Sequence, residues 1–155
     1  MKLALIGDVH GNMGKYFRLC TWAEENGYCT LQVGDLGFQY AHLRLCDSGL
    51  DPYKHQFFGG NHDVYPSPAW QWNAGNFGNC TRFGNTELFF VRGGFSIDRK
   101  YRTPGVDWFA EEELSEEQLQ RAERAYASSK PRIMVTHEAP REIANMLGNK
   151  DFLRD

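Results

Sequence analysis

The sequence predicts a single α/β domain, a sandwich of strands flanked by helices, on three observations. Short apolar runs alternate with helical segments along the chain, which is typical of α/β proteins. The 155 residues, 1–155, suit one domain, and neither a repeat nor a linker composition marks a boundary. The composition is 41% hydrophobic and 24% charged, which is ordinary for a folded domain and argues against disorder.

The predicted strands are short apolar runs, and glycine follows most of them directly. We expect strands over Lys2–Ile6, Thr30–Val33, Gln56–Phe58, Leu88–Arg92 and Ile133–Thr136. Glycine permits tight turns, so the chain can leave each strand abruptly. Loops at the carboxyl ends of strands build the sites of such folds, and we expect the chemistry there.

Three segments have the residue spacing of helices. Periodicity predicts a first helix over Lys15–Asn26, with Gly27 behind it. A second helix begins at Ser115, because Gln118 completes a capping box. A third helical stretch covers Arg141–Leu147.

The segment Val64–Gly84 is rich in proline, glycine and asparagine, and it predicts a loop over the site with one short helix around Ala69–Trp72. Aromatic residues here and further along could stack on a base, although such residues more often pack as local cores. They are Trp70, Trp72, Trp108 and Phe109.

Charge, hydropathy and cysteine usage exclude several classes. The formal charge of −3 leaves no generally basic coat for nucleic acid. No apolar run approaches the roughly 20 residues of a membrane span, and no signal peptide is recognisable, so we expect a cytoplasmic protein. The cysteines at 20, 29, 46 and 80 form no C-x-x-C pair, and we expect all to be reduced.

Polar clusters of one style follow four of the strands: GDVHG at 7–11, GDLG at 34–37, GGNHD at 59–63 and THE at 136–138. On an extended backbone, Asp8 and His10 would project to the same side as a metal clip, with Val9 pointing inward. Aspartate, histidine and asparagine ligands suit Mn²⁺, Fe, Zn²⁺ or Mg²⁺. The ligand set predicts hydrolytic rather than redox chemistry.

These motifs, in this order, resemble the calcineurin-like metallophosphoesterase family, including its phage and bacterial members. The resemblance covers Lys2–Pro140, and Gly93–Arg99 also looks like a segment of phage-encoded phosphatases. It implies the family's β-sandwich and a hydrolase, a phosphatase or phosphodiesterase, acting on phosphomonoesters or phosphodiesters.

The resemblance also implies roles for particular residues. Asp8 and His10 would hold one divalent ion, Asp35 would bridge two, and Asn61 with His137 would hold the second. His62 would be the catalytic imidazole, with Asp63 as its orienting partner. Two ions, manganese in assay with Fe, Zn or Mg as alternatives, would activate a bridging hydroxide toward phosphorus.

One family motif, a carboxyl-terminal G-H-x-H, is absent, since no histidine follows His137. We therefore expect a domain shortened at its carboxyl end, either naturally or by truncation, that lacks the last strands of the family. Metal affinity and activity should be lower. The exposed sheet edge left behind should favour self-association.

The substrate is expected to be a small phosphate ester or a nucleotide, held by Arg99 and Arg102. Two alternatives stay open. One is a catalytically impaired metal-binding or interaction protein on the same fold. The other is a nucleic-acid-binding module that uses the basic loop Arg99–Arg102.

Several conspicuous residues are expected to have structural roles. His42 and His55 lie outside the motifs, and Glu138 should be solvated or support the site rather than bind metal. The acidic run Glu111–Glu117 is favourable at the start of its helix.

Overall fold

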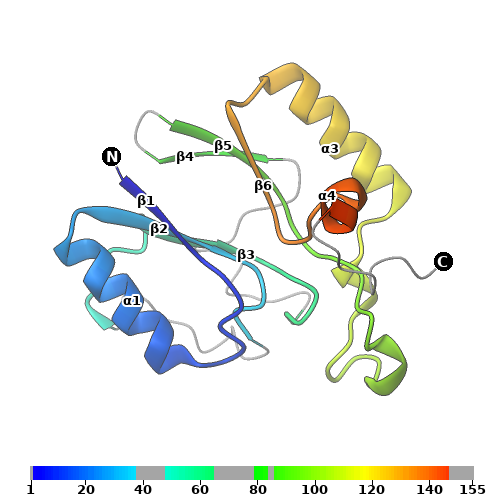
Figure 1. The fold of residues 1–155 in the computed structure, drawn as a ribbon, viewed down its shortest axis with the longest axis horizontal. Coiled ribbons are helices and arrows are strands. Elements are labelled where there is room, and N and C mark those ends of the chain that lie inside the picture. Colours follow the sequence, from blue (N-terminus) through cyan, green and yellow to red (C-terminus); the bar gives the residue numbers. More distant parts are fainter. Residues whose placement is uncertain (1, 38–47, 65–78, 84–85, 147–155) are drawn as a thin grey trace.

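The computed structural model describes residues 2–37, 48–64, 79–83 and 86–146 and contains two three-stranded sheets (Figure 1). The first sheet has the order β1-β2-β3, all parallel, with β1 at Lys2–Ile6, β2 at Tyr28–Val33 and β3 at His55–Phe58. The second has the order β4-β5-β6, with β4 at Asn79–Phe83, β5 at Thr86–Val91 and β6 at Ile133–Thr136. Strand β5 pairs antiparallel with β4 and parallel with β6.

The helices begin at recognisable caps. Helix α1 spans Met13–Glu25, and the side chain of Asn12 accepts a hydrogen bond from the Lys15 N–H, 3.0 Å away. Helix α3 spans Glu116–Ser129, and Ser115 and Gln118 form the predicted capping box. The shorter helices are α4 at Arg141–Met146 and the 3₁₀ helices η3 at Arg99–Tyr101 and η4 at Ala110–Glu112.

Side chains alternate between the two faces of each strand, and the elements on either face form layers. Thr30 of β2 faces α1, with its Oγ1 3.9 Å from Cys20 Sγ. The next residue, Leu31, points the other way into a cluster shared by both sheets. In that cluster the rings of Phe58 and Phe90 stack with centroids 5.4 Å apart. Helix α1, the two sheets and α3 therefore follow one another as layers (Figure 1).

The α/β class is confirmed in the form of two small open sheets with helices. Each predicted strand is present, and β2 begins earlier than expected, at Tyr28. The predicted loop Val64–Gly84 is wrong in part, because residues 79–83 form β4. Its sequence alternates weakly, and the antiparallel partner β5 supplies the missing stabilisation. The helix expected at Ala69–Trp72 lies outside the described residues.

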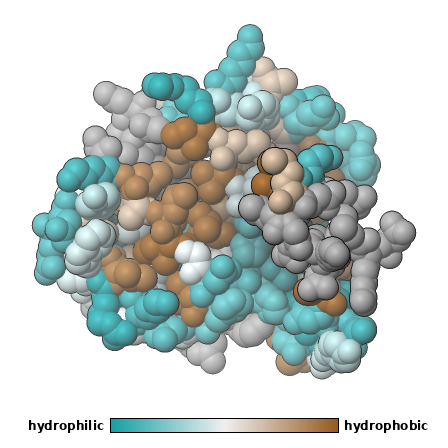
Figure 2. Space-filling view, viewed as in Figure 1, coloured by the Kyte–Doolittle hydropathy of each residue, from teal (hydrophilic) through white to brown (hydrophobic). Residues whose placement is uncertain are grey.

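Apolar side chains reach the surface along the outer strands β1 and β6. Leu5 is 59% exposed and Met134 is 51% exposed. Figure 2 shows a hydrophobic area on the face where β1 and β6 lie in Figure 1. None of the helices in the described ranges combines the length and the apolar composition that a membrane span requires.

Candidate metal centre

The loops after β1 and β2 are joined through their backbones. The His10 N–H donates to the Asp35 carbonyl at 2.8 Å, and the Gly11 N–H donates to the Leu36 carbonyl at 2.7 Å. The approach needs glycine at position 37, where φ is +134° and a Cβ would lie 2.5 Å from the Gly11 nitrogen. The two motifs GDVHG and GDLG therefore form one unit.

Asp8, His10 and Asp35 all adopt left-handed backbone conformations, with φ of 47°, 46° and 55°. Within the described ranges the one other non-glycine residue of this kind is Lys130. Such conformations cost on the order of 1–3 kcal/mol each and tend to cluster at functional sites. The extended clip predicted for Asp8 and His10 is therefore wrong, because left-handed turns bring them together. Val9 is buried between them, as expected.

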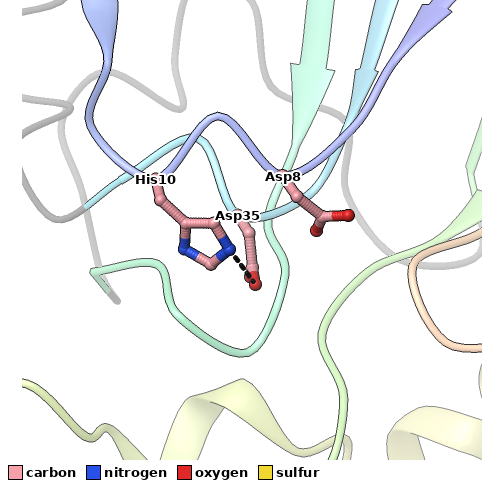
Figure 3. Close-up of side chains that lie close together, drawn as sticks. All are labelled: Asp8, His10 and Asp35. Atoms are coloured by element: carbon pink, nitrogen blue, oxygen red, sulfur yellow. Dashed lines mark ion pairs between the residues drawn. The ribbon is translucent and has the colours of Figure 1, made fainter.

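One ligand atom from each of Asp8, His10 and Asp35 lies within 4.8 Å of the others (Figure 3). His10 Nε2 is 3.7 Å from Asp35 Oδ2. The Asp35 side chain is 6% exposed, whereas that of His10 is 54% exposed, so the group has a buried floor and an open side. These three residues could hold a metal ion, as predicted.

His137 and Asn61 lie against the same aspartate. His137 Nε2 is 2.9 Å from Asn61 Oδ1 and 3.4 Å from Asp35 Oδ1. His137 Nδ1 is 2.9 Å from the Val33 carbonyl oxygen. There is no space for a side chain at Gly60, where a Cβ would lie 2.6 Å from the Asp35 nitrogen. All five predicted ligands thus meet at the carboxyl ends of the strands.

Comparisons with protein-family models, curated proteins and solved structures found no match. The capacity to bind metal therefore rests on the geometry of the side chains alone. The resemblance of the motifs to metallophosphoesterases stays a prediction.

Asp63 binds the backbone of the neighbouring loops. Its buried carboxylate accepts hydrogen bonds from the backbone N–H groups of Asp35, Gly37 and Gly60, at 2.9, 2.9 and 2.7 Å. A second carboxylate, that of Asp98, faces the His62 imidazole, with Oδ2 3.8 Å from Nε2. The oxygens of Asp63 therefore hold the loops after β2 and β3 together, and its role in orienting His62 stays a prediction.

His62 itself lies at the rim of the centre. Its backbone N–H donates to Asp35 Oδ1 at 2.9 Å, and its ring centroid is 5.5 Å from that of His10. The side chain is 26% exposed. A group bound at the metal centre could therefore contact the imidazole.

Arg102 also departs from the prediction. Its side chain is 6% exposed, and Nη2 is 2.9 Å from Glu112 Oε1. Nη1 donates to the Asn61 carbonyl at 3.0 Å. A guanidinium so fully engaged cannot receive a substrate phosphate, and the basic loop proposed for nucleic acid loses one of its cations. Arg99 stays exposed, with its guanidinium 4.1 Å above the Trp108 ring and 3.4 Å from Glu113.

Other predictions fare differently. Glu138 Oε1 accepts the Phe95 N–H at 2.7 Å, and burial raises the pKa of Glu138. His55 is confirmed as a core histidine, fully buried with Nδ1 2.9 Å from Thr30 Oγ1. Cys20 and Cys29 are free thiols. The other cysteine side chains, His42 and the tryptophans at 70 and 72 lie outside the described part of the structure.

The sequence interpretation missed Ser96, Asp98 and Glu112. Ser96 and Asp98 lie within Gly93–Arg99, the segment that the sequence interpretation compared with phosphatases without giving either residue a role. Glu112 was hidden in an acidic run. The first turn of α3 carries Glu116 and Glu117, as predicted. Glu112 is instead fully buried, and burial raises its pKa although the hydrogen bonds that it accepts oppose the shift.

Proposed function

We propose that the protein is a metal-dependent phosphoesterase that hydrolyses phosphomonoesters or phosphodiesters, with a small phosphate ester or nucleotide as substrate. The observation that carries the proposal is the convergence of Asp8, His10 and Asp35 on strained backbone at the ends of two adjacent strands. These residues would hold one divalent ion. Asp35 would share a second ion with Asn61 and His137.

The surroundings of His137 support the second ion. A carbonyl oxygen can only accept, so Nδ1 carries the hydrogen that bonds Val33, and Nε2 is the nitrogen that would bind a metal ion. That nitrogen lies 2.9 Å from Asn61 Oδ1 and 3.4 Å from Asp35 Oδ1. Ligand atoms around an octahedral ion with bonds of about 2.1 Å stand about 3.0 Å apart. The spacing of Nε2 and Asn61 Oδ1 therefore suits two ligand atoms of one cation.

Divalent ions held this way lower the pKa of bound water and neutralise phosphoryl oxygens. Oxygen and imidazole ligands without thiolate suit Mn²⁺, our choice for assay. Asp35, almost fully buried, would fix the floor of the centre through its contacts to His10 and to the His62 N–H. The His62 side chain, at the open rim, would give a proton to the departing oxygen.

The test is hydrolysis of bis(p-nitrophenyl) phosphate and p-nitrophenyl phosphate by protein dialysed against EDTA, with and without added Mn²⁺. We expect Mn²⁺-dependent release of p-nitrophenol that Asp35→Asn abolishes. The matched control is Asp51→Asn, which alters a carboxylate 3.9 Å from Lys54 and should keep full activity. Tight Mn²⁺ binding without hydrolysis of either ester would contradict the proposal and favour a non-catalytic metal-binding protein.

A further inference from the structure

A buried polar network lies behind Asn61, on the side opposite His137. Asn61 Nδ2 donates to Ser96 Oγ at 3.0 Å. The same oxygen lies 2.8 Å from Glu112 Oε2 and 2.6 Å from Arg102 Nη1. Ser96 and Glu112 are buried, and the Arg102 side chain is almost completely so. Among the predicted ligands, this network touches Asn61.

Hydrogen counting fixes the direction of each bond. A serine hydroxyl has one hydrogen to donate and two lone pairs to accept. Arg102 only donates, so the hydroxyl accepts from it. Its one hydrogen goes to the Glu112 carboxylate at 2.8 Å rather than to the Asn61 carbonyl at 3.2 Å, because the carboxylate is the closer acceptor and is charged. The remaining lone pair of the hydroxyl takes a hydrogen from Asn61 Nδ2. A flipped Asn61 amide would place Oδ1 against a hydroxyl with no hydrogen left.

The network also holds the backbone at Asn61. Arg102 Nη1 donates to the Asn61 carbonyl at 3.0 Å. Arg102 is anchored in turn by Glu112, whose Oε1 also accepts the Phe109 N–H at 3.0 Å. The backbone carbonyl of Glu112 accepts the Gly94 N–H at 3.0 Å. The segment after β5 thus folds around the Arg102–Glu112 ion pair, and Arg102 connects this pair to Asn61.

We propose that Ser96, held by the Arg102–Glu112 pair, is a positioning residue that fixes the Asn61 amide with Oδ1 toward His137 and so completes the second metal site. This inference rests on the proposed function, which supplies the second ion. Partners that orient metal ligands typically change metal affinity by roughly 10–100-fold when they are removed. We expect a loss of that size from Ser96→Ala, confined to one ion.

Ser96→Ala is the informative variant because it removes one oxygen and adds nothing. Substituting Arg102 or Glu112 leaves a buried charge unpaired and can unfold the domain. The matched control is Ser128→Ala on the exposed face of α3. A second background, Asn61→Asp, tests orientation directly, since a carboxylate presents an oxygen whichever way it turns.

The experiment is a Mn²⁺ titration of the full chain by calorimetry and electron paramagnetic resonance, with His10→Asn assigning the ion beside Asp8. We expect two ions in the wild type, and a 10–100-fold loss for the ion beside His137 in Ser96→Ala. Adding Ser96→Ala to Asn61→Asp should change that affinity less than about threefold. Thermal unfolding in EDTA checks that each variant folds.

The outcomes separate the inference from the function on which it rests. Two ions in the wild type that Ser96→Ala leaves unchanged, or weakens equally, overturn the inference alone. If Ser96→Ala lowers the Mn²⁺ affinity as much in the Asn61→Asp background as in the wild type, the inference is also overturned, because a merely structural serine would act in both backgrounds. A wild type that binds one ion overturns the second site and this inference together, while hydrolysis by a single ion stays testable.

Discussion

The carboxylate of Asp63 accepts a hydrogen bond from the backbone N–H of Asp35, with 2.9 Å between the nitrogen and Oδ2. It also accepts the N–H groups of Gly37 and Gly60. One buried anion therefore ties the loop after β3 to the loop after β2. The left-handed conformation of Asp35 is maintained by a residue outside the group of ligands.

We predict that Asp63→Ala lowers the free energy of unfolding by on the order of 3 kcal/mol or more, because it strands buried N–H donors that cost about 1–3 kcal/mol each. Metal affinity should fall with it, since Asp35 loses its support. Chemical denaturation in EDTA and Mn²⁺ titration measure the two effects. The stability of Asp63→Asn, which keeps one accepting oxygen, should lie between those of the wild type and Asp63→Ala. Wild-type stability in Asp63→Ala would contradict this account.

The contrast between Asp8 and Asp63 shows which parts of the site can be predicted from the sequence. Asp8 follows an apolar run and a glycine, and both signals are local, so its place at a strand end could be predicted. The partners of Asp63 are set by tertiary contacts between loops distant in the chain. The GGNHD motif alone was therefore compatible with either a catalytic or a structural role for Asp63.

Glu112 and β4 are two further features that depend on tertiary contacts and could not be predicted from the sequence. An acidic run at a helix start is ordinary surface, and only the approach of Arg102 makes one member a buried ion pair. Residues 79–83 are a weak strand by composition and become one through pairing with β5. The remaining strands are short apolar runs, and glycine follows all of them except β6, so these local signals made them predictable.

His62→Asn should reduce turnover by roughly 10²–10⁴-fold while metal binding persists. The imidazole lies beside His10, and the tie of position 62 to the centre is its backbone N–H, which asparagine retains. Steady-state hydrolysis of an aryl phosphate and Mn²⁺ calorimetry on the same preparation give both quantities. As the matched comparison, His10→Asn should lose metal. Equal metal loss in the two variants would defeat the assignment of His62.

The stability of the fold should depend on pH through His55. Burial lowers the pKa of this imidazole, although the Glu24 carboxylate 3.1 Å away opposes the shift. Between the lowered pKa and the ordinary value near 6.5, the unfolded chain binds more protons than the folded one. The contribution of neutral His55 is therefore fully present above about pH 6.5 and is lost as the pH falls through that window.

We predict that His55→Gln flattens this dependence. The wild type should lose up to about 1.4 kcal/mol of unfolding free energy per pH unit from this one group, and the variant should lose less. Urea denaturation in EDTA between pH 7.5 and 5.5 measures the slopes, and the other histidines contribute equally to both proteins. Glu24 titrates lower, because its pKa is itself lowered, first by the Asp51 N–H. Parallel slopes would exclude His55 as the cause.

The exposed strands β1 and β6 lead to a last prediction, self-association. Each borders its sheet among the described strands, and each carries exposed apolar side chains, Leu5 on β1 and Met134 on β6. An edge with open backbone groups and apolar flanks can pair with a second chain. We expect light scattering after size exclusion to show a mass that rises with protein concentration.

The edge responsible can be identified by placing charge on it. Met134→Lys and Leu5→Lys should each shift the protein toward monomer if their strand is the contact, because a buried lysine opposes strand pairing. Tyr53→Lys is the matched control, since Tyr53 is exposed in a turn before β3 rather than on either edge. A wild type that stays monomeric at every concentration would mean that the apolar area of Figure 2 is tolerated in water without a second copy.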